Sequence, residues 1–436
     1  MPVTHLDFER PLAALDARVE ALRRGGTRGP AITRELRRLA VDTATPPFNC
    51  KAESGTVALP TLKDATNVAR KSAPDPLVDR ERAKIDRIDE RILGLLSARA
   101  RIAQRIGHRK ARQRAGGPGG ADGFWVPSRE KRIYQRLRAL NKGPLADDVV
   151  RAIFREIISA SRALEARVTV AFLGPEGTFT NAAAREVFGA GATLTPAESI
   201  AEVFTEVEHR RADFGVVPVE NSTEGAVTST LDLLIESPLR ITAEVRLDID
   251  QCLLATATDW SEIRRVLSHP QGLAQCRRWL ASNIPHATLE AVASTSRAAE
   301  LAADDPKVAA IASRMAAERS GLRVLAAKIQ DETANATRFF VLGHRDAESP
   351  SGDDKTSVVC TVKDEVGVLA KLLQPLAACG VSLHKIESRP LRGQPWEYVF
   401  FLDLRGHRSD ARVKRALARM APLTTSMKIL GSYPAA

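Results

Sequence analysis

The chain has 436 residues, of which 44% are hydrophobic and 27% charged, a composition typical of a soluble globular protein with two to four domains. It contains no run of about 18 apolar residues, and its N-terminus has no signal-peptide pattern, so we expect a cytoplasmic protein without a membrane span. The net charge of +11 combined with only 5% aromatic residues favours small anionic ligands over nucleic acid.

The five cysteines are scattered and form no Cys-x-x-Cys pair. This pattern indicates reduced core residues, with neither a disulfide framework nor a zinc site. The sequence also lacks a cluster of His, Asp and Glu that would suggest another metal. We therefore expect no metal and no cofactor.

Residues 1–75 carry the weakest pattern in the chain. A helix is expected near their start, with one apolar face formed by Leu12, Leu15, Val19 and Leu22. Residues 41–75 show no periodicity and several Thr, Pro and Ser, which favours a linker. We interpret residues 1–75 as an N-terminal extension.

From Asp79 to about Arg112 the apolar residues recur at helical spacing, which predicts one long helix. Its apolar stripe consists of Ile85, Ile88, Ile92, Leu95, Leu96, Ile102 and Ile106. A Gly-rich loop interrupts the pattern, and two further helices are expected over about 128–140 and 145–166.

Two cations lie within this stripe. Arg99 follows Leu95 by four residues, and Lys110 follows Ile106 by four. On the third predicted helix, Ser161 and Glu165 are also four apart on the apolar face. Charges on such a face indicate either a bound anionic ligand or a buried ion pair between Arg99 and Glu165, and the pattern alone leaves both open.

The length of the first helix adds a constraint. Arg82 precedes Arg99 by 17 residues, about 25 Å at ~1.5 Å per residue, so the two guanidiniums of one straight helix cannot meet one small ligand. Two antiparallel copies that exchange ends can bring them together. We therefore expect a homodimer or a higher homo-oligomer.

Three segments carry a resemblance here: RERAKIDRIDERILGLLSARARIAQRIGHRK, PSREKRIYQRL and FREIISASRALE. Residues 78–167 resemble the all-helical chorismate mutase domain. The match is specific because of the arrangement of Arg82, Arg99, Lys110, Arg129, Glu130, Ser161 and Glu165. The resemblance implies the Claisen rearrangement of chorismate to prephenate, without a cofactor or a covalent intermediate.

The resemblance also implies residue roles. Arg99 and Arg82 of the partner subunit would clamp the two carboxylates of the substrate. Lys110 would donate to the breaking ether oxygen and to a carboxylate, because a pericyclic step needs a compressed conformer and stabilised charge on that oxygen. Arg129 would help to bind the substrate, and Glu130 would hold its ring hydroxyl.

Two positions depart from the pattern of this family. An acidic residue found in some relatives is Val126 here, and the glutamine of some relatives is Glu165. To donate to the ether oxygen Glu165 must carry a proton, so mutase activity should decline toward alkaline pH. Ser161 would belong to the same binding set. A vestigial mutase domain stays open as an alternative.

At Val168 the pattern changes to apolar strands that end in Gly and polar turns, with helices between them. The segment NATRFFVLG places Thr337 and Arg338 directly before an apolar run typical of a buried strand. Burying a hydroxyl without a partner costs about 1–3 kcal/mol, and a charge costs more. On pattern alone, a turn hydroxyl and a surface ion pair would be favoured at these two positions.

Four motifs change that preference: GPEGTFT (174–180), VPVENSTEG (217–225), SHPQGLAQC (268–276) and NATRFF (335–340). Residues 168–345 resemble prephenate dehydratase throughout. The resemblance implies an α/β fold of two lobes around a cleft, like periplasmic binding proteins, and the decarboxylative dehydration of prephenate to phenylpyruvate.

Hydroxide is the poor leaving group in this reaction, so the site needs a proton donor and groups that hold the carboxylates. Thr337 is the residue that we expect to donate or to orient the hydroxyl, with Glu220 as a neighbour that shares the proton. Arg338 would anchor a carboxylate or brace the loop, and Phe339 would wall the pocket. The remaining polar lining is expected from Thr178, Asn221, Ser222 and Gln271. His269 is interpreted as a packed loop histidine.

From about Lys355 the expected order is βαββαβ within roughly 80 residues, the α+β ferredoxin-like arrangement. The segments EVGVLAKLL (365–373) and ESRP (387–390) make residues 354–436 resemble an ACT domain, an amino-acid-sensing module. The resemblance implies an allosteric phenylalanine site and feedback inhibition of the dehydratase. Its residues would be Gly367, Val368, Leu369, Glu387, Ser388, Arg389 and Pro390.

The whole pattern favours a bifunctional enzyme of phenylalanine biosynthesis that acts on chorismate and prephenate, with L-phenylalanine as effector. A non-catalytic amino-acid sensor with a binding-protein-like cleft is the alternative from another class. A dehydrogenase is disfavoured because no strand-associated G-x-G-x-x-G is present. A DNA-binding regulator is disfavoured because no recognition element is evident.

Overall fold

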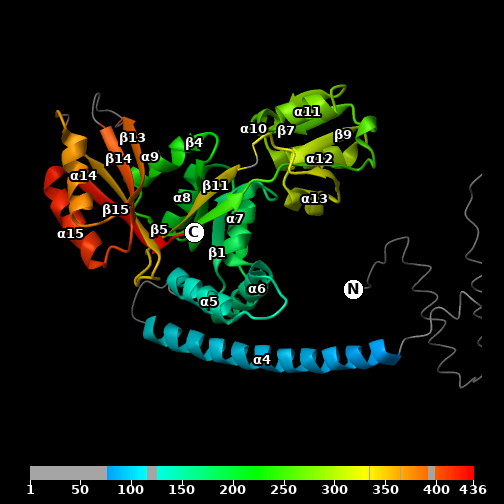
Figure 1. Cartoon of the computed structure of the whole chain (residues 1–436), viewed down its shortest axis with the longest axis horizontal. Coiled ribbons are helices and arrows are strands. Elements are labelled where there is room, and N and C mark those ends of the chain that lie inside the picture. The colour runs from blue at the N-terminus through cyan, green and yellow to red at the C-terminus, as the bar shows by residue number, and fades with distance from the viewer. Residues whose placement is uncertain (1–75, 115–124, 333, 364, 391–397) are drawn as a thin grey trace, which may run out of the picture. The chain divides into compact units, whose positions relative to one another are not determined.

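The computed structural model describes residues 76–114, 125–332, 334–363, 365–390 and 398–436 (Figure 1). The chain divides into two compact units, Met1–Ala83 and Lys84–Ala436, and each is considered by itself. The predicted N-terminal helix, the linker and most of the predicted Gly-rich loop lie outside the described residues.

Three helices begin the described chain: α4 (Pro76–Arg114), α5 (Pro127–Leu140) and α6 (Asp147–Glu165). All three were predicted within a few residues, because the apolar period is sustained over several turns. The stripe on α4 is nevertheless exposed, from 36% at Leu96 to 71% at Leu95. Among the described residues, no helix combines the length and the apolar character that crossing a membrane requires.

The first sheet of the central region has the strand order β2-β1-β3-β11-β5, with β4 paired to β3. Parallel pairing joins β1 to β2 and β3, whereas β11 runs antiparallel to both β3 and β5. Its elements are β1 (Thr169–Leu173), α7 (Phe179–Phe188), β2 (Thr193–Ala197), α8 (Ile200–Glu208), β3 (Phe214–Asn221), β4 (Gly225–Ala226), α9 (Thr228–Glu236), β5 (Arg240–Asp248) and β11 (Ala336–Gly343).

A second sheet, with the order β10-β6-β9-β7-β8, lies between β5 and β11 in the sequence. Its elements are β6 (Cys252–Ala255), η2 (Trp260–Glu262), β7 (Arg265–Ser268), α10 (Pro270–Gln275), α11 (Arg277–Asn283), β8 (Thr288–Ala291), α12 (Thr295–Asp304), β9 (Val308–Ala312), α13 (Arg314–Ser320) and β10 (Arg323–Ala327). The chain therefore leaves the first sheet after β5 and returns to it at β11, the strand that carries Thr337.

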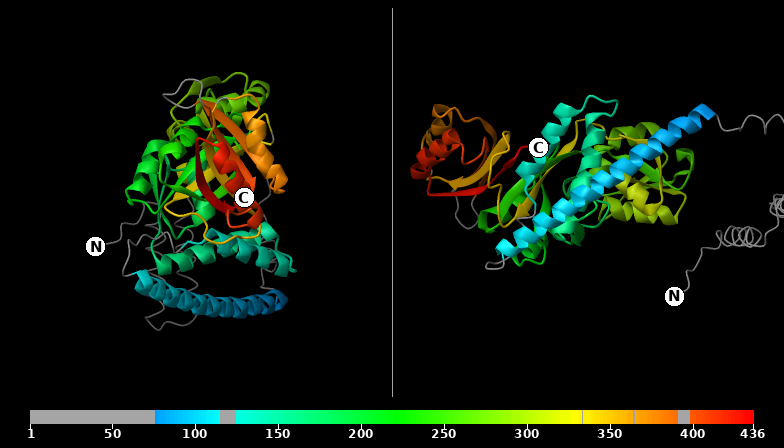
Figure 2. Two further views of the ribbon diagram at one scale, coloured as in Figure 1. Left: turned by 90° about the vertical axis from the view of Figure 1, so that its left-hand side faces the viewer. Right: turned by 90° about the horizontal axis from the view of Figure 1, so that it is seen from below.

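The C-terminal region has one four-stranded sheet in the order β13-β14-β12-β15. Its elements are β12 (Asp354–Thr361), α14 (Val368–Ala378), β13 (Leu383–Pro390), β14 (Tyr398–Arg405), α15 (Ala411–Met420), η3 (Ala421–Leu423) and β15 (Ser426–Pro434). The order of strands and helices is the predicted one. Helices α14 and α15 lie side by side on one face of this sheet (Figures 1 and 2).

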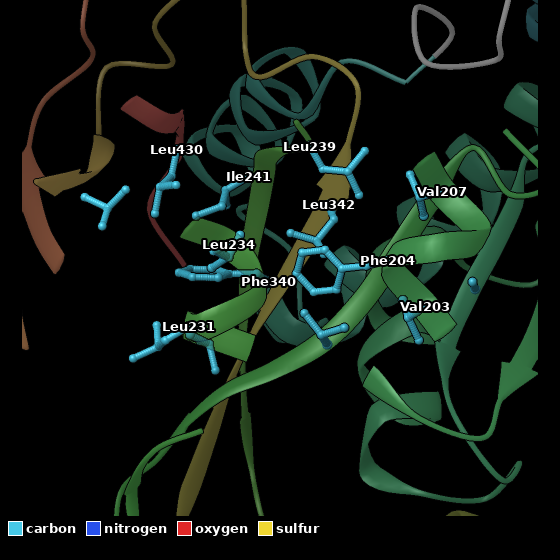
Figure 3. Close-up of a cluster of buried hydrophobic side chains, with 14 of the residues drawn as sticks. Val203, Phe204, Val207, Leu231, Leu234, Leu239, Ile241, Phe340, Leu342 and Leu430 are labelled. Atoms are coloured by element: carbon cyan, nitrogen blue, oxygen red, sulfur yellow. The ribbon is translucent and has the colours of Figure 1, made fainter. Parts of the chain in front are cut away.

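The other face of the C-terminal sheet packs against the first sheet. Leu430 of β15 lies beside Ile241 of β5 and close to Phe340 of β11 within one apolar cluster (Figure 3). The same cluster contains Val359 and Phe401 from the C-terminal sheet, both nearly inaccessible to solvent. This shared core joins the strand of Thr337 directly to the C-terminal region.

A second cluster joins the helical region to the first sheet. The ring of Trp125, just before α5, lies 4.6 Å from that of Phe188 and 5.0 Å from that of Phe214, measured between centroids. Its neighbours include Phe339 of β11, which is 1% exposed. Helices α5 and α6 are thereby anchored on the sheet.

Candidate active sites

The first site lies where α4 meets α6. A Cβ at Gly107 would lie 2.9 Å from Glu165 Cα, so only glycine permits this approach of the two helices without a shift. The approach places Lys110 Nζ 3.0 Å from Glu165 Oε2. These two opposite charges stabilise each other at the end of both helices.

Arg99 contacts the middle of α6. Its guanidinium donates to Ser161 Oγ and, at 3.2 Å, to the carbonyl oxygen of Ile157. The alternative of an Arg99–Glu165 ion pair is wrong, because Glu165 pairs with Lys110. Burial lowers the pKa of the Arg99 guanidinium, while nearby Glu165 acts in the opposite direction. Arg99 is thus a partly desolvated cation with a neutral partner.

These residues surround a cavity of about 410 Å³, within the range of about 300–1,000 Å³ found for small-molecule sites. Of the predicted mutase residues, the cavity brings together all except Arg82. Its lining is Arg99, Ile102, Ala103, Ile106, Lys110, Val126, Arg129, Glu130, Arg132, Ile133, Ile158, Ser161, Arg162 and Glu165. The cations have room for a small anionic guest beside them.

Arg82 lies in the other compact unit, and its placement relative to the cavity is not defined. Its side chain is 71% exposed and pairs with Asp79 at 3.3 Å, one turn earlier on α4. A role at a cavity of another copy of the chain stays a prediction.

Arg162 is a cavity residue that was not predicted. It is 6% exposed, and its Nη1 lies 3.6 Å from Glu130 Oε1. The sequence did carry a signal for it, because Arg162 follows Ile158 by four residues on the apolar face of α6. Glu130 itself lies in the first turn of α5, where the helix dipole favours a negative charge.

The second site is built on paired strands β3 and β11. Their register places Thr337 opposite Asn221, and Asn221 Nδ2 donates to Thr337 Oγ1 at 2.8 Å. Both residues are buried, with Thr337 9% exposed. Among the described residues this is the one hydrogen bond of the Thr337 side chain, so its own proton has no protein acceptor there. Thr337 was expected directly before the buried strand. It lies inside it, because the strand begins at Ala336.

An amide network extends this site toward the second sheet. Asn335 Oδ1 accepts from Asn221 Nδ2 at 3.3 Å, and Asn335 Nδ2 donates to Gln275 Oε1 at 3.1 Å. Gln275 Oε1 also accepts from Gln251 Nε2 at 3.1 Å. Asn335 and Gln275 stand inside two of the recognised motifs but were not predicted as site residues.

The other predicted dehydratase residues are spread over the regions of the first and the second sheet. Ser222 lies beside Thr337, since its hydroxyl accepts from the Ala336 amide at 2.9 Å. Thr178 caps α7 by accepting from the Asn181 amide. Gln271 lies in the first turn of α10, where His269 is the N-cap, in line with the structural role expected of that histidine.

Arg338 lies on the opposite face of β11 from Thr337, because successive side chains of a strand alternate. Its guanidinium donates to Glu244 at 2.7 Å, to Asp403 at 2.6 Å and to Tyr433 Oη at 3.1 Å. Burial opposes the charge, but Tyr433, Asp403 and Glu244 raise the pKa of Arg338 above its ordinary value. The expectation that Arg338 anchors a substrate carboxylate at Thr337 is corrected by this orientation, which supports the bracing role instead.

Two further expectations change with these orientations. Glu220 pairs with Lys385 at 2.9 Å and with Arg338 at 3.6 Å, and so faces the C-terminal region instead of Thr337. Phe339 is a core residue of the cluster around Trp125. The predicted surroundings of Glu220 and Phe339 were therefore wrong, because the sequence does not show which layer covers each face of β11.

In the C-terminal region, Gly367 is the N-cap of α14, with a φ of +79° that disfavours other residues. Val368 and Leu369 form the first turn of this helix. On β13 the exposure alternates, so Glu387 and Arg389 face inward whereas Ser388 and Pro390 face outward. Arg389 also pairs with Asp232 of α9 at 3.6 Å.

The chain matches three family models. One described as chorismate mutase type II matches residues 81–166, one described as prephenate dehydratase matches residues 170–347, and one described as ACT domain matches residues 356–421.

A bifunctional chorismate mutase/prephenate dehydratase of Aquifex aeolicus is 45% identical over 359 residues, which are 81% of this chain and 97% of that protein. Among solved structures, prephenate dehydratase from Arthrobacter aurescens in complex with L-Phe is 38% identical with a TM-score of 0.57, and the match covers 62% of this chain and 90% of that one. A structure titled as a quorum-quenching acylase also has a TM-score of 0.57 at 31% identity, over 62% of this chain and 98% of that one.

Proposed function

The chain belongs to the family of bifunctional chorismate mutase/prephenate dehydratases and is an enzyme with both catalytic domains and an ACT regulatory domain, and from this premise we propose how its residues carry out the two reactions. The domains extend over residues 78–167, 168–345 and 354–436, after an extension of residues 1–75. The observation that carries the mutase assignment is the cavity, which gathers Arg99, Lys110 and Glu165 around space for a guest.

Chorismate is a dianion, and the cavity supplies its counterions. Arg99 binds one carboxylate in exchange for its present hydrogen bond to Ser161, and Arg129 contributes a second cation at the rim. Arg82 of the partner subunit binds the other carboxylate. Lys110 donates to the ether oxygen, where negative charge grows as the carbon–oxygen bond breaks. The cavity walls hold the substrate in its compressed conformer.

Glu165 is the second donor to the ether oxygen. The Lys110 ammonium now lies 3.0 Å from its carboxylate. When Lys110 turns to the substrate, its ion pair with Glu165 opens, and both side chains can reach the ether oxygen. Glu130 accepts a hydrogen bond from the ring hydroxyl. These roles argue against a vestigial mutase domain.

We place the partner subunit on the exposed stripe of α4. Ile85, Ile88 and Ile92 are each about half exposed, which is costly for a continuous apolar face in water. An antiparallel second α4 would cover this stripe and would bring its Arg82 to the cavity. The assembly is therefore a homodimer or a larger homo-oligomer in the cytoplasm.

We place the dehydratase site between the two sheets, in an arrangement like that of periplasmic binding proteins. Asn221 occupies a lone pair of Thr337 Oγ1, so the Thr337 proton is directed to the leaving hydroxyl of prephenate. Threonine is a weak acid, and its proton must be replaced after the reaction. The partly buried amide network of Asn335 and Gln275 orders the polar groups beside Thr337. The loss of carbon dioxide and the gain of aromaticity supply the driving force.

L-Phenylalanine is the effector, and its site lies on the ferredoxin-like ACT domain. The positive end of the helix dipole at the N-terminus of α14, after Gly367, favours its carboxylate. Glu387 is the acceptor for its ammonium group, with the outward-facing Ser388 and Pro390 at an interface between two copies. Binding shifts the equilibrium between two quaternary arrangements.

Two single substitutions separate the two activities. Lys110→Met should remove prephenate formation from chorismate but leave phenylpyruvate formation from added prephenate. Thr337→Val should do the reverse, with a loss of about 10²-fold or more in kcat, as expected when general-acid assistance is removed. If each variant lost both activities, or if Thr337→Val changed KM alone, the assigned sites would be wrong.

A further inference from the structure

Arg162 connects the mutase cavity to the dehydratase domain. We propose that Arg162 is a positioning residue of the mutase site, which keeps the Glu130 carboxylate charged and aimed at the ring hydroxyl of the substrate. The inference rests on the proposed function of Glu130 as the acceptor for that hydroxyl. Arg162 acts through Glu130 and does not itself bind the substrate.

The guanidinium of Arg162 is held from two sides. Its Nη2 donates to the carbonyl oxygen of Phe188 at 3.2 Å, at the C-terminal end of α7 in the dehydratase domain. Its plane lies over the rings of Trp125 and Phe188, 5.9 Å and 5.5 Å from their centroids. The hydrogen bond and the ring contacts hold the guanidinium in the protein interior. In this orientation Nη1 points to Glu130.

Nη1 is buried and has no hydrogen-bond partner among the described residues. It lies 3.6 Å from Glu130 Oε1, near enough for an ion pair but longer than a hydrogen bond of about 2.8 Å. A small movement of Glu130 on substrate binding therefore completes a charge-assisted hydrogen bond. Nη1 of Arg162 is the available donor for this bond.

The electrostatics of Glu130 show why a counterion is required. Burial raises the pKa of the Glu130 carboxyl, and Arg162 is the strongest influence that lowers it. Arg99 of α4 faces the same carboxyl and acts in the same direction more weakly. Tyr134, one turn later on α5, is neutral at physiological pH, since burial above all raises its pKa to about 12.

Among the described residues, Glu130 and Glu165 are the two whose carboxylates line the cavity. Glu165 is paired with Lys110 at the other end. Val126, which also lines the cavity, is apolar and cannot accept a hydrogen bond from the hydroxyl. The charged state of Glu130 is therefore decisive for binding the hydroxyl, and a carboxylate accepts a stronger hydrogen bond than a carboxylic acid.

The test compares Arg162→Gln with Arg162→Lys in the full-length enzyme. Gln retains an amide donor for the Phe188 carbonyl but has no charge, so Glu130 should protonate at a higher pH. In the pH profile of mutase kcat/KM, the fall on the acid side should then shift to higher pH by about one unit. This shift lowers kcat/KM by up to about tenfold at pH 6 and little at pH 8. Lys retains the charge, and its profile should stay close to that of the wild type.

Arg155→Gln is the matched control. Arg155 lies two turns earlier on α6, pairs with Glu186 of α7, and does not line the cavity. Its substitution removes another cation between the same two domains and should leave the mutase profile unchanged. In a Glu130→Gln background, Arg162→Gln should produce no further change on the acid side of the profile.

Dehydratase turnover with added prephenate reports whether each variant is folded. Two outcomes would overturn the proposal and leave Arg162 with a structural role. One is a loss of mutase kcat/KM in Arg162→Gln that is equal at every pH, and the other is the same loss in Arg162→Lys. If Arg162→Gln fails to fold, the Arg162→Lys variant is sufficient for the test. A shift of the acid side of its mutase pH profile relative to the wild type contradicts the proposal. Absence of mutase activity in the wild type would instead contradict the proposed function.

Discussion

Asn221 on β3 donates its side-chain N–H to the hydroxyl oxygen of Thr337 on β11 at 2.8 Å. The opposite end of the same amide is also fixed, since Asn221 Oδ1 accepts from the backbone N–H of Thr223 at 2.9 Å. The amide therefore cannot turn over without losing both contacts. Its orientation is what leaves the Thr337 proton available to a substrate.

Asn221→Asp tests this orientation. The carboxylate keeps the acceptor for Thr223 but presents an acceptor to Thr337, so the Thr337 hydroxyl must donate to Asp instead of to prephenate. We expect kcat of the dehydratase to fall by about 10²-fold, as for the loss of an acid catalyst, with mutase activity retained. Steady-state assays with each substrate measure both. Unchanged kcat in a folded variant contradicts the proposed direction of the proton.

Arg338→Met tests the correction made above for Arg338. The substitution leaves the buried Asp403 without this cation, and leaves Glu244 with Lys355 as its cationic partner. Removing one partner of such a group costs about 3 kcal/mol or more of unfolding free energy. Denaturant unfolding should show this loss, whereas a substrate anchor would show a raised KM for prephenate with ordinary stability. Arg345→Met is the control, because Arg345 is 61% exposed and pairs only at the surface.

Glu165→Gln tests the proton on Glu165. If a protonated Glu165 donates to the ether oxygen, kcat/KM of the mutase falls as the pH rises and the carboxyl loses its proton. Gln donates at every pH, so the variant should have a flat profile in the alkaline range. The readout is the ratio of mutase kcat/KM at alkaline and neutral pH. A variant that still declines like the wild type would refute the assigned role.

Ser388→Ala tests the effector site. Ser388 faces outward on β13, so its removal should change stability by less than about 0.5 kcal/mol. We expect weaker inhibition by L-phenylalanine and nearly intact turnover without it. Inhibition curves of the dehydratase with added prephenate measure both quantities. Thr361→Ala serves as a control on another strand of the same sheet, and equal inhibition in all three proteins would remove Ser388 from the site.

The sequence predicts local order well in this chain. The period of the apolar residues on α4 is sustained over seven positions, and the strand and turn pattern after Val168 is equally regular. Helical spacing predicted that Arg99 and Lys110 share the apolar face of α4, and that Ser161 and Glu165 share that of α6. The remaining mutase residues were predicted from the resemblance to the chorismate mutase domain. Spacing within a helix determines which side chains share a face.

Relationships between distant segments could not be predicted in the same way. The alternation along β11 shows that Thr337 and Arg338 point to opposite faces, but not that the C-terminal sheet covers the face of Arg338. Glu244, Asp403 and Tyr433 come from three strands that the sequence does not join. The partners of Glu220 and the core position of Phe339 were missed for the same reason.

The central claim is that one chain holds two working pockets for small dianions. Incubating the purified protein with chorismate alone, and following phenylpyruvate with and without L-phenylalanine, tests it most directly. We predict that phenylpyruvate forms from chorismate and that L-phenylalanine lowers its rate of formation. Prephenate that accumulates without phenylpyruvate, or chorismate that is not consumed, would contradict the account.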